Sequence, residues 1–170
     1  MAQDSSFEQR QDEGISVFLT SSALDLSGVV ASVKSPKAGA LVLFAGTTRD
    51  NFQGKSVTHL EYSSYPPRAL KTMLSIAQTM KQKHALTAIT MGHRLGVVPV
   101  AEESILIAVS APHRQPAWTA GEEALEMCKE KVEIWKLEEF EGDQGGVWRA
   151  NRDGPTHVPS DLASSNDISR

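Results

Sequence analysis

Apolar residues recur along the chain in two patterns, one typical of strands and one typical of helices. Short runs that are apolar, or that alternate with a period of two, predict strands over residues 15–20, 39–48, 57–65, 87–95, 104–111, 134–140 and 146–150. Apolar residues at helical spacing predict helices over 25–33, from Pro66-Pro67 to about Met80, and after residue 114. Strand pairs lying between helices favour an α+β fold, with a mixed or antiparallel sheet and packed helices, over a doubly wound parallel sheet.

Two of the predicted strands are apolar on both faces. Residues 39–48 read GALVLFAGTT and residues 104–111 read SILIAVSA, and such runs are typical of strands in the centre of a sheet. The first run leads directly into Arg49, and the second is followed by His113-Arg114. A rigid scaffold could therefore present these cations together at one end of the sheet, as an anion site. The alternative is that each is a solvated charge at a strand end, and the sequence alone does not show that they meet.

His93 and Cys128 are both predicted to be structural. His93 lies inside the alternating run 87–95, and a histidine within a strand is more often buried and hydrogen-bonded than catalytic. Cys128 follows Ala117, Gly121 and Ala124 on the small-residue face of the third helix, with no histidine near it in sequence. A buried thiol in that setting is inert.

Composition and charge restrict the class of protein. Of 170 residues, 40% are hydrophobic and 22% are charged, which is ordinary for one globular domain. A net charge of -4 gives no general attraction for nucleic acid or for an anionic membrane surface. The single cysteine cannot form an internal disulfide, and the histidines and carboxylates show no metal-ligand spacing. We therefore expect no metal, no other cofactor and a reducing compartment.

The two ends of the chain differ from the rest. Residues 1–14 and 155–170 are polar and have few large apolar residues, so both are expected to be flexible tails around one domain over residues 15–154. The N-terminus lacks the residue order of a secretory or mitochondrial presequence. No run approaches the about 20 consecutive apolar residues of a membrane helix. The expected location is the cytosol.

Lys129 and Lys136 are candidates for chemistry, although spacing alone does not separate them from surface lysines. Lys129 flanks the apolar stripe of the third helix, so its ammonium could lie beside apolar surface. Lys136 follows Trp135 in a predicted strand, so the two side chains are expected on opposite faces, one toward the core and one toward the surface.

Several segments, taken in order, resemble the large subunit of molybdopterin synthase: GALVLFAGTTRD, LEYSSYPPRA, GHRLG, SAPHR, CKEKVEIWKLE and GGVWRANRD. The resemblance spans residues 39–154 and implies an α+β fold. It implies a homodimer of large subunits within a cytosolic heterotetramer, in which each large subunit binds one small ubiquitin-like sulfur carrier. It also implies a sulfurtransferase of molybdenum cofactor biosynthesis. Sulfur would pass from the thiocarboxylate on the carrier's C-terminal Gly-Gly to cyclic pyranopterin monophosphate, forming the dithiolene of molybdopterin.

The resemblance also implies which residues act. Lys129 and Lys136 match the family's catalytic lysines, and a fixed ammonium would stabilise or protonate the negative charge that develops when the cyclic phosphate opens. The implied substrate-binding residues are Thr47, Thr48, Arg49, His113, Arg114, Lys129, Lys136, Leu137, Glu138 and Arg152. Arg152 is implied to reach the pocket of the other protomer. Leu137 stands where many relatives carry a further basic residue.

Two other interpretations stay open at this point. The chain could be a non-catalytic module that binds a phosphorylated metabolite or a ubiquitin-like partner through the same basic pocket. It could also be a cysteine-dependent acyltransferase that uses Cys128. Formation of a dithiolene product from the carrier and the pyranopterin distinguishes the sulfurtransferase from both of these interpretations.

Overall fold

A five-stranded sheet carries most of the hydrophobic core. The computed structural model describes residues 7–10, 13–142, 146 and 148–151. In these residues the first sheet has the order β1 (Phe7–Arg10), β2 (Ile15–Thr20), β6 (Ala88–Arg94), β8 (Glu103–Ala111) and β3 (Ala40–Thr47). Only the β2–β6 pair of this sheet is parallel. The predicted α+β fold with a mixed sheet is confirmed.

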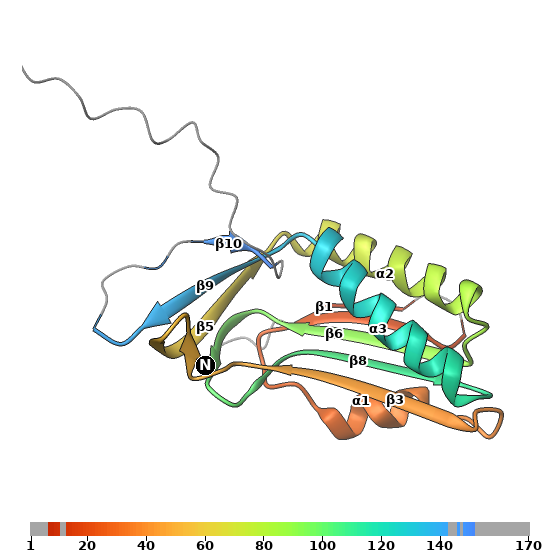
Figure 1. Ribbon diagram of the computed structural model, residues 1–170. Helices are drawn as coiled ribbons and strands as arrows, with labels where there is room; N and C mark the ends of the chain where they lie inside the picture. Colours follow the sequence, from red (N-terminus) through yellow and green to blue (C-terminus); the bar gives the residue numbers. More distant parts are fainter. Residues whose placement is uncertain (1–6, 11–12, 143–145, 147, 152–170) are drawn as a thin grey trace, which may run out of the picture.

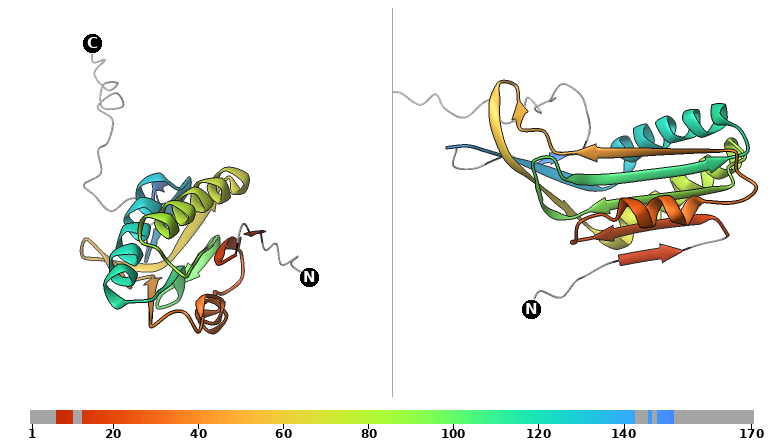
Figure 2. Two further views of the ribbon diagram at one scale, coloured as in Figure 1. Left: turned by 90° about the vertical axis from the view of Figure 1, so that its right-hand side faces the viewer. Right: turned by 90° about the horizontal axis from the view of Figure 1, so that it is seen from below.

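Helices cover both faces of the first sheet. Helix α1 (Leu26–Val33) lies on one face, and helices α2 (Pro66–Lys83) and α3 (Arg114–Lys131) lie side by side on the other (Figures 1 and 2). Helix α2 begins at the proline pair, because the first helical turn needs no N–H from proline. All three helices fall where the apolar spacing predicts them.

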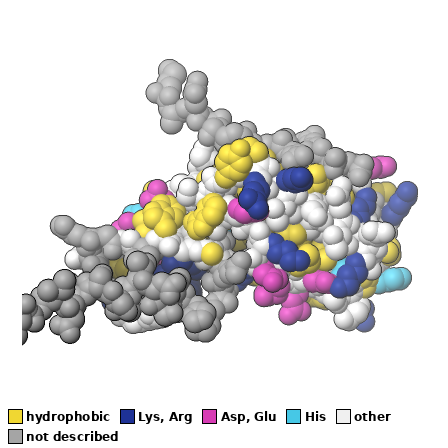
Figure 3. Space-filling view, turned by 90° about the horizontal axis from the view of Figure 1, so that it is seen from above, with side chains coloured by type: hydrophobic (Ala, Val, Ile, Leu, Met, Phe, Trp, Pro, Cys, Tyr) yellow, Lys and Arg dark blue, Asp and Glu magenta, His cyan; other side chains and the backbone are white. Residues whose placement is uncertain are grey.

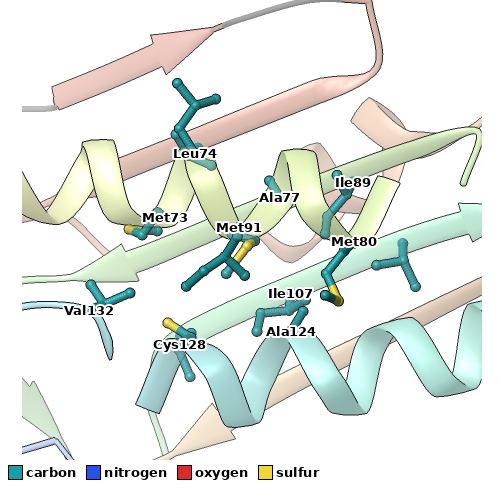
Figure 4. Packing of buried hydrophobic residues seen from close by; sticks show 14 of the residues in the cluster. Met73, Leu74, Ala77, Met80, Ile89, Met91, Ile107, Ala124, Cys128 and Val132 are labelled. Atoms are coloured by element: carbon teal, nitrogen blue, oxygen red, sulfur yellow. The ribbon is translucent and has the colours of Figure 1, made fainter. Parts of the chain in front are cut away.

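The larger core lies between the sheet and the α2–α3 layer. Met73, Ala77 and Met80 of α2 meet Ile89 and Met91 of β6 there (Figure 4). Fully burying a side chain as large as methionine or isoleucine contributes about 1.5–3 kcal/mol. Helix α3 packs closely with small residues, which are Ala117, Ala120, Gly121, Ala124 and Cys128. This layer therefore holds α3 at a fixed distance from β8 and β3.

Strand β3 lies at an edge of the first sheet, not in its centre as predicted. Its side chains alternate between two cores: Val42 and Phe44 pack toward α2 and α3, whereas Leu43 and Ala45 pack toward α1. This explains why both faces are apolar. The outer edge of β3 has no partner strand in the described part of the chain, and Leu41 is 37% exposed. The other doubly apolar strand, β8, is central as predicted.

A second, smaller sheet lies beyond the end of the first sheet at which β3 and β6 finish (Figure 1). Its order is β10 (Arg149–Ala150), β9 (Ile134–Phe140), β5 (Lys55–Ser64) and β4 (Asn51–Phe52), and β7 (Gly96–Pro99) also pairs with β5. All of these pairs are antiparallel. Strands β5 and β9 match the predictions, β10 is shorter than the predicted run 146–150, and β4 and β7 were not predicted.

The segment GHRLG carries the chain from the first sheet into the second. A Cβ atom on Gly92 would lie 2.2 Å from the Phe18 ring, so glycine lets this ring pack over β6. Gly96 has φ 79°, in the left-handed region that favours glycine. Arg94 donates a hydrogen bond from Nη1 to Oε2 of Glu102 at 2.5 Å. The conformation of Gly96 and the Arg94–Glu102 pair thus fix the turn by which the chain leaves the first sheet.

The ends of the chain differ in part from the prediction. Phe7–Arg10, within the predicted N-terminal tail, form β1 and pair with β2 in antiparallel register. The predicted C-terminal tail, residues 155–170, lies outside the described residues. None of the described helices is long and apolar enough to cross a membrane.

Candidate functional site

The predicted cations do not meet at one end of the sheet within a single chain. Strands β3 and β8 are antiparallel, so Ala40 at the start of β3 lies opposite Ala111 at the end of β8. Arg49 therefore lies beyond one end of this strand pair, and His113 and Arg114 lie beyond the other. The eight residues of β3 separate the two ends by about 25 Å. These cations therefore do not form one anion site within a single chain, because antiparallel strands finish at opposite ends.

Helix α3 returns the chain to the end of the sheet that carries Arg49. Its 18 residues, from Arg114 to Lys131, span about 27 Å and run back along the sheet (Figure 1). Lys129, in the last turn, therefore lies at the end opposite Arg114. Strand β9 begins at Ile134, directly after the helix, and carries Lys136. The structure thus places Arg49, Lys129 and Lys136 at one end, and His113 and Arg114 at the other.

Lys129 belongs to a stripe of α3 that faces away from α2. Glu123 marks the α2 side, because Lys83 of α2 donates to its Oε1 at 2.5 Å. Trp118, Leu125 and Lys129 are spaced seven and four residues apart, so they share one side of the helix, turned away from Glu123. We call these three residues the outer stripe of α3. Trp118 is 64% exposed, which is unusual for so large an apolar side chain in a single chain.

The end of β3 presents two of the predicted residues to solvent and buries a third. Thr47 and Arg49 are exposed, whereas Thr48 is buried. Thr48 donates from Oγ1 to the Val98 carbonyl at 3.3 Å and from its backbone N–H to the Glu102 carbonyl at 3.0 Å. Thr48 therefore fixes the loop, and its side chain is committed to the protein interior.

Lys136 lies in a cluster of charges on the second sheet. Its side chain is 17% exposed, and Nζ lies 3.8 Å from Oε1 of Glu138. Arg149 is the cross-strand neighbour of Lys136, and its Nη2 lies 3.6 Å from Oε2 of Glu138. The Glu138 side chain is only 6% exposed, and among the described residues its Oε2 accepts no hydrogen bond. Two cations therefore share one buried carboxylate.

The neighbours of Lys136 on β9 only partly follow the prediction. Alternation along the strand places Trp135 and Lys136 on opposite faces, as expected. However, Trp135 is 42% exposed and is the more exposed of the two, so the lysine is not the surface residue of the pair. The Leu137 side chain is buried, so Leu137 can reach a ligand only through its backbone. Arg152, the last predicted site residue, lies outside the described residues.

The sequence did not point to Arg149, or to Phe52, which lies beside Arg149 in addition to Glu138. The Arg149 guanidinium lies 5.5 Å from the centre of the Phe52 ring, which is within the range of a cation–π contact. Both residues belong to two-residue strands, β10 and β4, whose patterns are too short to predict. The one available signal was the segment that contains Arg149, which resembles the family.

Surface charge does not form a single basic patch on the α2–α3 face. Basic side chains alternate there with acidic ones, beside a group of hydrophobic side chains (Figure 3). One such pair joins Nε of Arg68 to Oε1 of Glu133 at 2.8 Å. An anion site on this acidic protein must therefore be built locally, from side chains held at the sheet ends.

Cys128 has the properties of a structural residue. It is buried, and burial raises the pKa of its thiol to about 12. The thiol is therefore protonated at neutral pH, and the thiolate that an acyltransferase would need is not formed. In the described part of the chain, no three His, Cys, Asp or Glu side chains gather as a metal site.

His93 is fully buried and hydrogen-bonded at both ring nitrogens. Its Nδ1 lies 2.8 Å from the Arg94 carbonyl, so Nδ1–H donates, and Nε2 accepts from Nδ2 of Asn151 at 3.4 Å. The edge of the ring meets the Tyr62 ring at a centroid distance of 4.8 Å. Burial lowers the pKa of His93 to about 4, so the imidazole is neutral at physiological pH. His93 thus supports the junction between the sheets.

Acid is expected to destabilise the protein through His93. Because the pKa is about 4 in the folded chain and 6.5 in the reference state, the unfolded chain takes up the proton first as pH falls. The contribution of His93 to the free energy of unfolding is fully present above pH 6.5. About 3 kcal/mol of this contribution is lost between pH 6.5 and pH 4. Urea unfolding of the wild type and His93→Gln across this range measures the difference.

The His93→Gln variant should lose this part of the pH dependence, whereas His84→Gln should retain it. His84 is a suitable control because it is only partly buried and is paired with Glu123. In the wild type, imidazole NMR signals should show His93 neutral at pH 5.5. A His93 that is protonated at that pH would contradict the prediction.

Comparison with known proteins gives one consistent result. Residues 19–131 match the family model described as MoaE protein. A relative from Sclerotinia sclerotiorum named molybdopterin synthase catalytic subunit is 66% identical over 143 residues, which cover 84% of this chain and 73% of the relative. A relative of the same name from Neurospora crassa is 61% identical over 150 residues, which cover 88% and 73%.

Solved structures share the fold. The crystal structure of molybdopterin synthase from Staphylococcus aureus matches with a TM-score of 0.73 at 33% identity, covering 77% of this chain and 94% of that chain. A complex of subunits 1 and 2 of molybdopterin-converting factor from Helicobacter pylori matches with a TM-score of 0.66 at 20% identity, covering 86% and 99%. The second match supports the fold alone.

Proposed function

We propose that this chain, which belongs to the MoaE protein family, is the catalytic subunit of a molybdopterin synthase. In the proposed reaction, two sulfur atoms pass to cyclic pyranopterin monophosphate, each from the thiocarboxylated C-terminal Gly-Gly of one small ubiquitin-like carrier, whose terminus is left as a carboxylate after hydrolysis. The product is the dithiolene of molybdopterin, and the reaction takes place in the cytosol. The observation that carries the proposal is the placement of Lys129 and Lys136 at one end of the fold, in a chain of this family.

The residues at this end fit the chemistry of the reaction. Attack by the carrier sulfur opens the cyclic phosphate and develops negative charge on oxygen. A fixed ammonium stabilises or protonates that charge, and we assign this role to Lys129, with Lys136 as the second catalytic lysine. Arg49 is exposed at the same end and is suited to bind the phosphate through its planar guanidinium. Thr47 and Glu138 complete the proposed lining of the substrate site.

The remaining site residues are proposed with narrower roles. Thr48 acts by holding the loop that presents Arg49, because its own hydroxyl is hydrogen-bonded inside the protein. Leu137 contacts substrate through its backbone. Arg152 keeps its proposed role of reaching the site of the other protomer.

A second copy of the chain is needed to bring His113 and Arg114 to the lysines. We propose a homodimer in which the outer edges of the two β3 strands pair in antiparallel register about a two-fold axis. The end of one β3 then lies beside the start of the other, so Arg49 approaches His113 and Arg114 of the partner subunit. Each such dimer has two identical sites, and a carrier bound to each large subunit makes the heterotetramer.

The exposed apolar surface supports this arrangement. Strand β3 reads ALVLFAGT, without a charged residue, and sheets ordinarily protect such an edge or pair it. The same axis makes α3 antiparallel to α3 of the partner, so Trp118 and Leu125 of the outer stripe become covered. Lys129, at the far end of that stripe, then approaches Arg114 of the partner subunit. The same two-fold axis therefore covers the exposed apolar residues and brings together cations that lie at opposite ends of a single chain.

Mixing the purified chain with a thiocarboxylated carrier and cyclic pyranopterin monophosphate is expected to yield a dithiolene product. A carrier that ends in an ordinary carboxylate should yield none, because it holds no sulfur to transfer. Cys128→Ala should retain the activity, because the buried thiol has no role in the reaction. The product is measured by mass spectrometry. Tight carrier binding without any product would instead identify a non-catalytic binding module.

A further inference from the structure

Arg149 lies beside the second catalytic lysine, although neither spacing nor the resemblance assigns it a role. It is the cross-strand neighbour of Lys136 on β10. Its guanidinium lies 3.6 Å from one oxygen of Glu138, and the Lys136 ammonium lies 3.8 Å from the other oxygen. Both distances exceed the about 2.7–2.9 Å of a charge-assisted hydrogen bond. Glu138 is therefore balanced between two cations and is not hydrogen-bonded to either.

This balance matters because the Glu138 carboxylate is buried. A buried carboxylate without a close partner is costly, and it draws in whichever cation is free to move. Lys136 has a flexible four-carbon stem, so its ammonium is free to close on Glu138 if nothing else neutralises the acid. An ammonium held in that way would be withdrawn from the substrate. Arg149, with its planar guanidinium on the other oxygen, opposes that closure.

Arg149 itself is held from several sides. The Phe52 ring lies 5.5 Å from its guanidinium. The next residues are tied to the fold, since the Asn151 backbone N–H donates to the Ile134 carbonyl at 3.1 Å and the Asn151 side chain donates to His93. The chain directly after this two-residue strand is thus anchored to the fold. The guanidinium is placed well enough to act through Glu138.

We propose that Arg149 is a positioning residue of the sulfur-transfer site. It neutralises Glu138 from one side and so leaves the Lys136 ammonium available to the charge that develops on the substrate. The role rests on the proposed function and adds to it a residue that acts through Glu138 and does not touch the substrate. The cluster of Lys136, Glu138 and Arg149 keeps a net positive charge of one, which an anionic reaction needs.

Replacing Arg149 by Gln is expected to lower kcat about tenfold with little change in KM, because the loss falls on transition-state charge. Arg149→Lys should restore most of the rate, since it returns a cation to the same place. Arg68→Gln is the matched control: it breaks the exposed pair with Glu133 and should leave kcat unchanged. A normal kcat in Arg149→Gln, or no rescue by Lys, would overturn the proposal.

A double-mutant cycle separates an action through Glu138 from direct contact with the substrate. Glu138→Gln removes the charge that draws Lys136 away, so adding Arg149→Gln to it should cause little further loss of kcat. If the loss remains tenfold in that background, Arg149 acts on the substrate itself and the positioning role is wrong.

Crystal structures of the wild type and Arg149→Gln give a readout that does not depend on activity. In the variant, the distance from Lys136 Nζ to Glu138 Oε1 should shorten from 3.8 Å to about 2.8 Å. An unchanged distance would overturn the proposal even if kcat fell. Failure of the proposed function is recognised separately, because the wild type would then form no dithiolene product while the distances could still be compared.

Discussion

Lys129→Ala is expected to lower kcat for dithiolene formation by at least about a hundredfold, the usual effect of removing a general acid or a charge aimed at the transition state. Carrier binding should survive, because the substitution removes a single side chain and leaves the fold around it intact. The rate is measured in single turnovers with excess enzyme, so that product release does not hide the chemical step.

Lys131→Ala is the matched control for this experiment. Lys131 lies in the same last turn of α3, so its loss costs the helix a similar C-terminal charge, but it is exposed outside the outer stripe. Its kcat should stay within about twofold of the wild type. Lys129→Arg tests position as well as charge, and a bulkier guanidinium should rescue only part of the rate. An undiminished rate in Lys129→Ala would remove Lys129 from the mechanism.

The long elements could be predicted because burial leaves a clear pattern in the sequence. Helix α2 carries buried residues at Ala69, Met73, Ile76 and Met80, and β8 is apolar throughout because both of its faces are covered. Strands β4, β7 and β10 have two to four residues each, and pairing with β5 and β9 holds them in place. Their own side chains carry too few positions to reveal a period.

The position of β3 shows a limit of the same pattern. Side chains report whether the two faces of a strand are covered. In β3 both faces are covered, because Phe44 packs into the core beside α2 and α3, and Leu43 packs into the core beside α1. Side chains do not report whether the backbone edge is paired. A strand that is central in a dimer therefore has the same sequence pattern as a strand that is central in one chain.

The candidate site was predictable in part for a related reason. The sequence indicates that Arg49 and His113 follow strands, but not that β3 and β8 are antiparallel, and strand direction decides whether the cations meet. The helical spacing of Trp118, Leu125 and Lys129 is visible in the sequence and becomes informative once α2 is known to lie on the other side. Arg149 depends on the register of β10 against β9, which no local pattern encodes.

Two inactive variants are expected to restore activity when they are combined. If each site takes Lys129 from one chain and His113 and Arg114 from the other, a mixed dimer of Lys129→Ala and His113→Ala/Arg114→Ala contains one site with every group intact. Its second site carries all the lesions. The experiment uses substrate well below the wild-type KM, where lost phosphate binding appears directly as lost rate.

Random exchange of subunits makes half of the dimers mixed, and one of the two sites in each mixed dimer is intact. The expected rate is therefore about a quarter of the wild type, from two preparations that are each nearly inactive. Mixing Lys129→Ala with Lys136→Ala is the control and should restore nothing, because both lysines lie at the same end of one chain and every mixed site lacks one of them. Native mass spectrometry confirms the exchange. A first mixture that exchanges fully yet stays inactive would mean that His113 and Arg114 do not complete the site of the partner chain, because only a shared site allows one chain to supply what the other has lost.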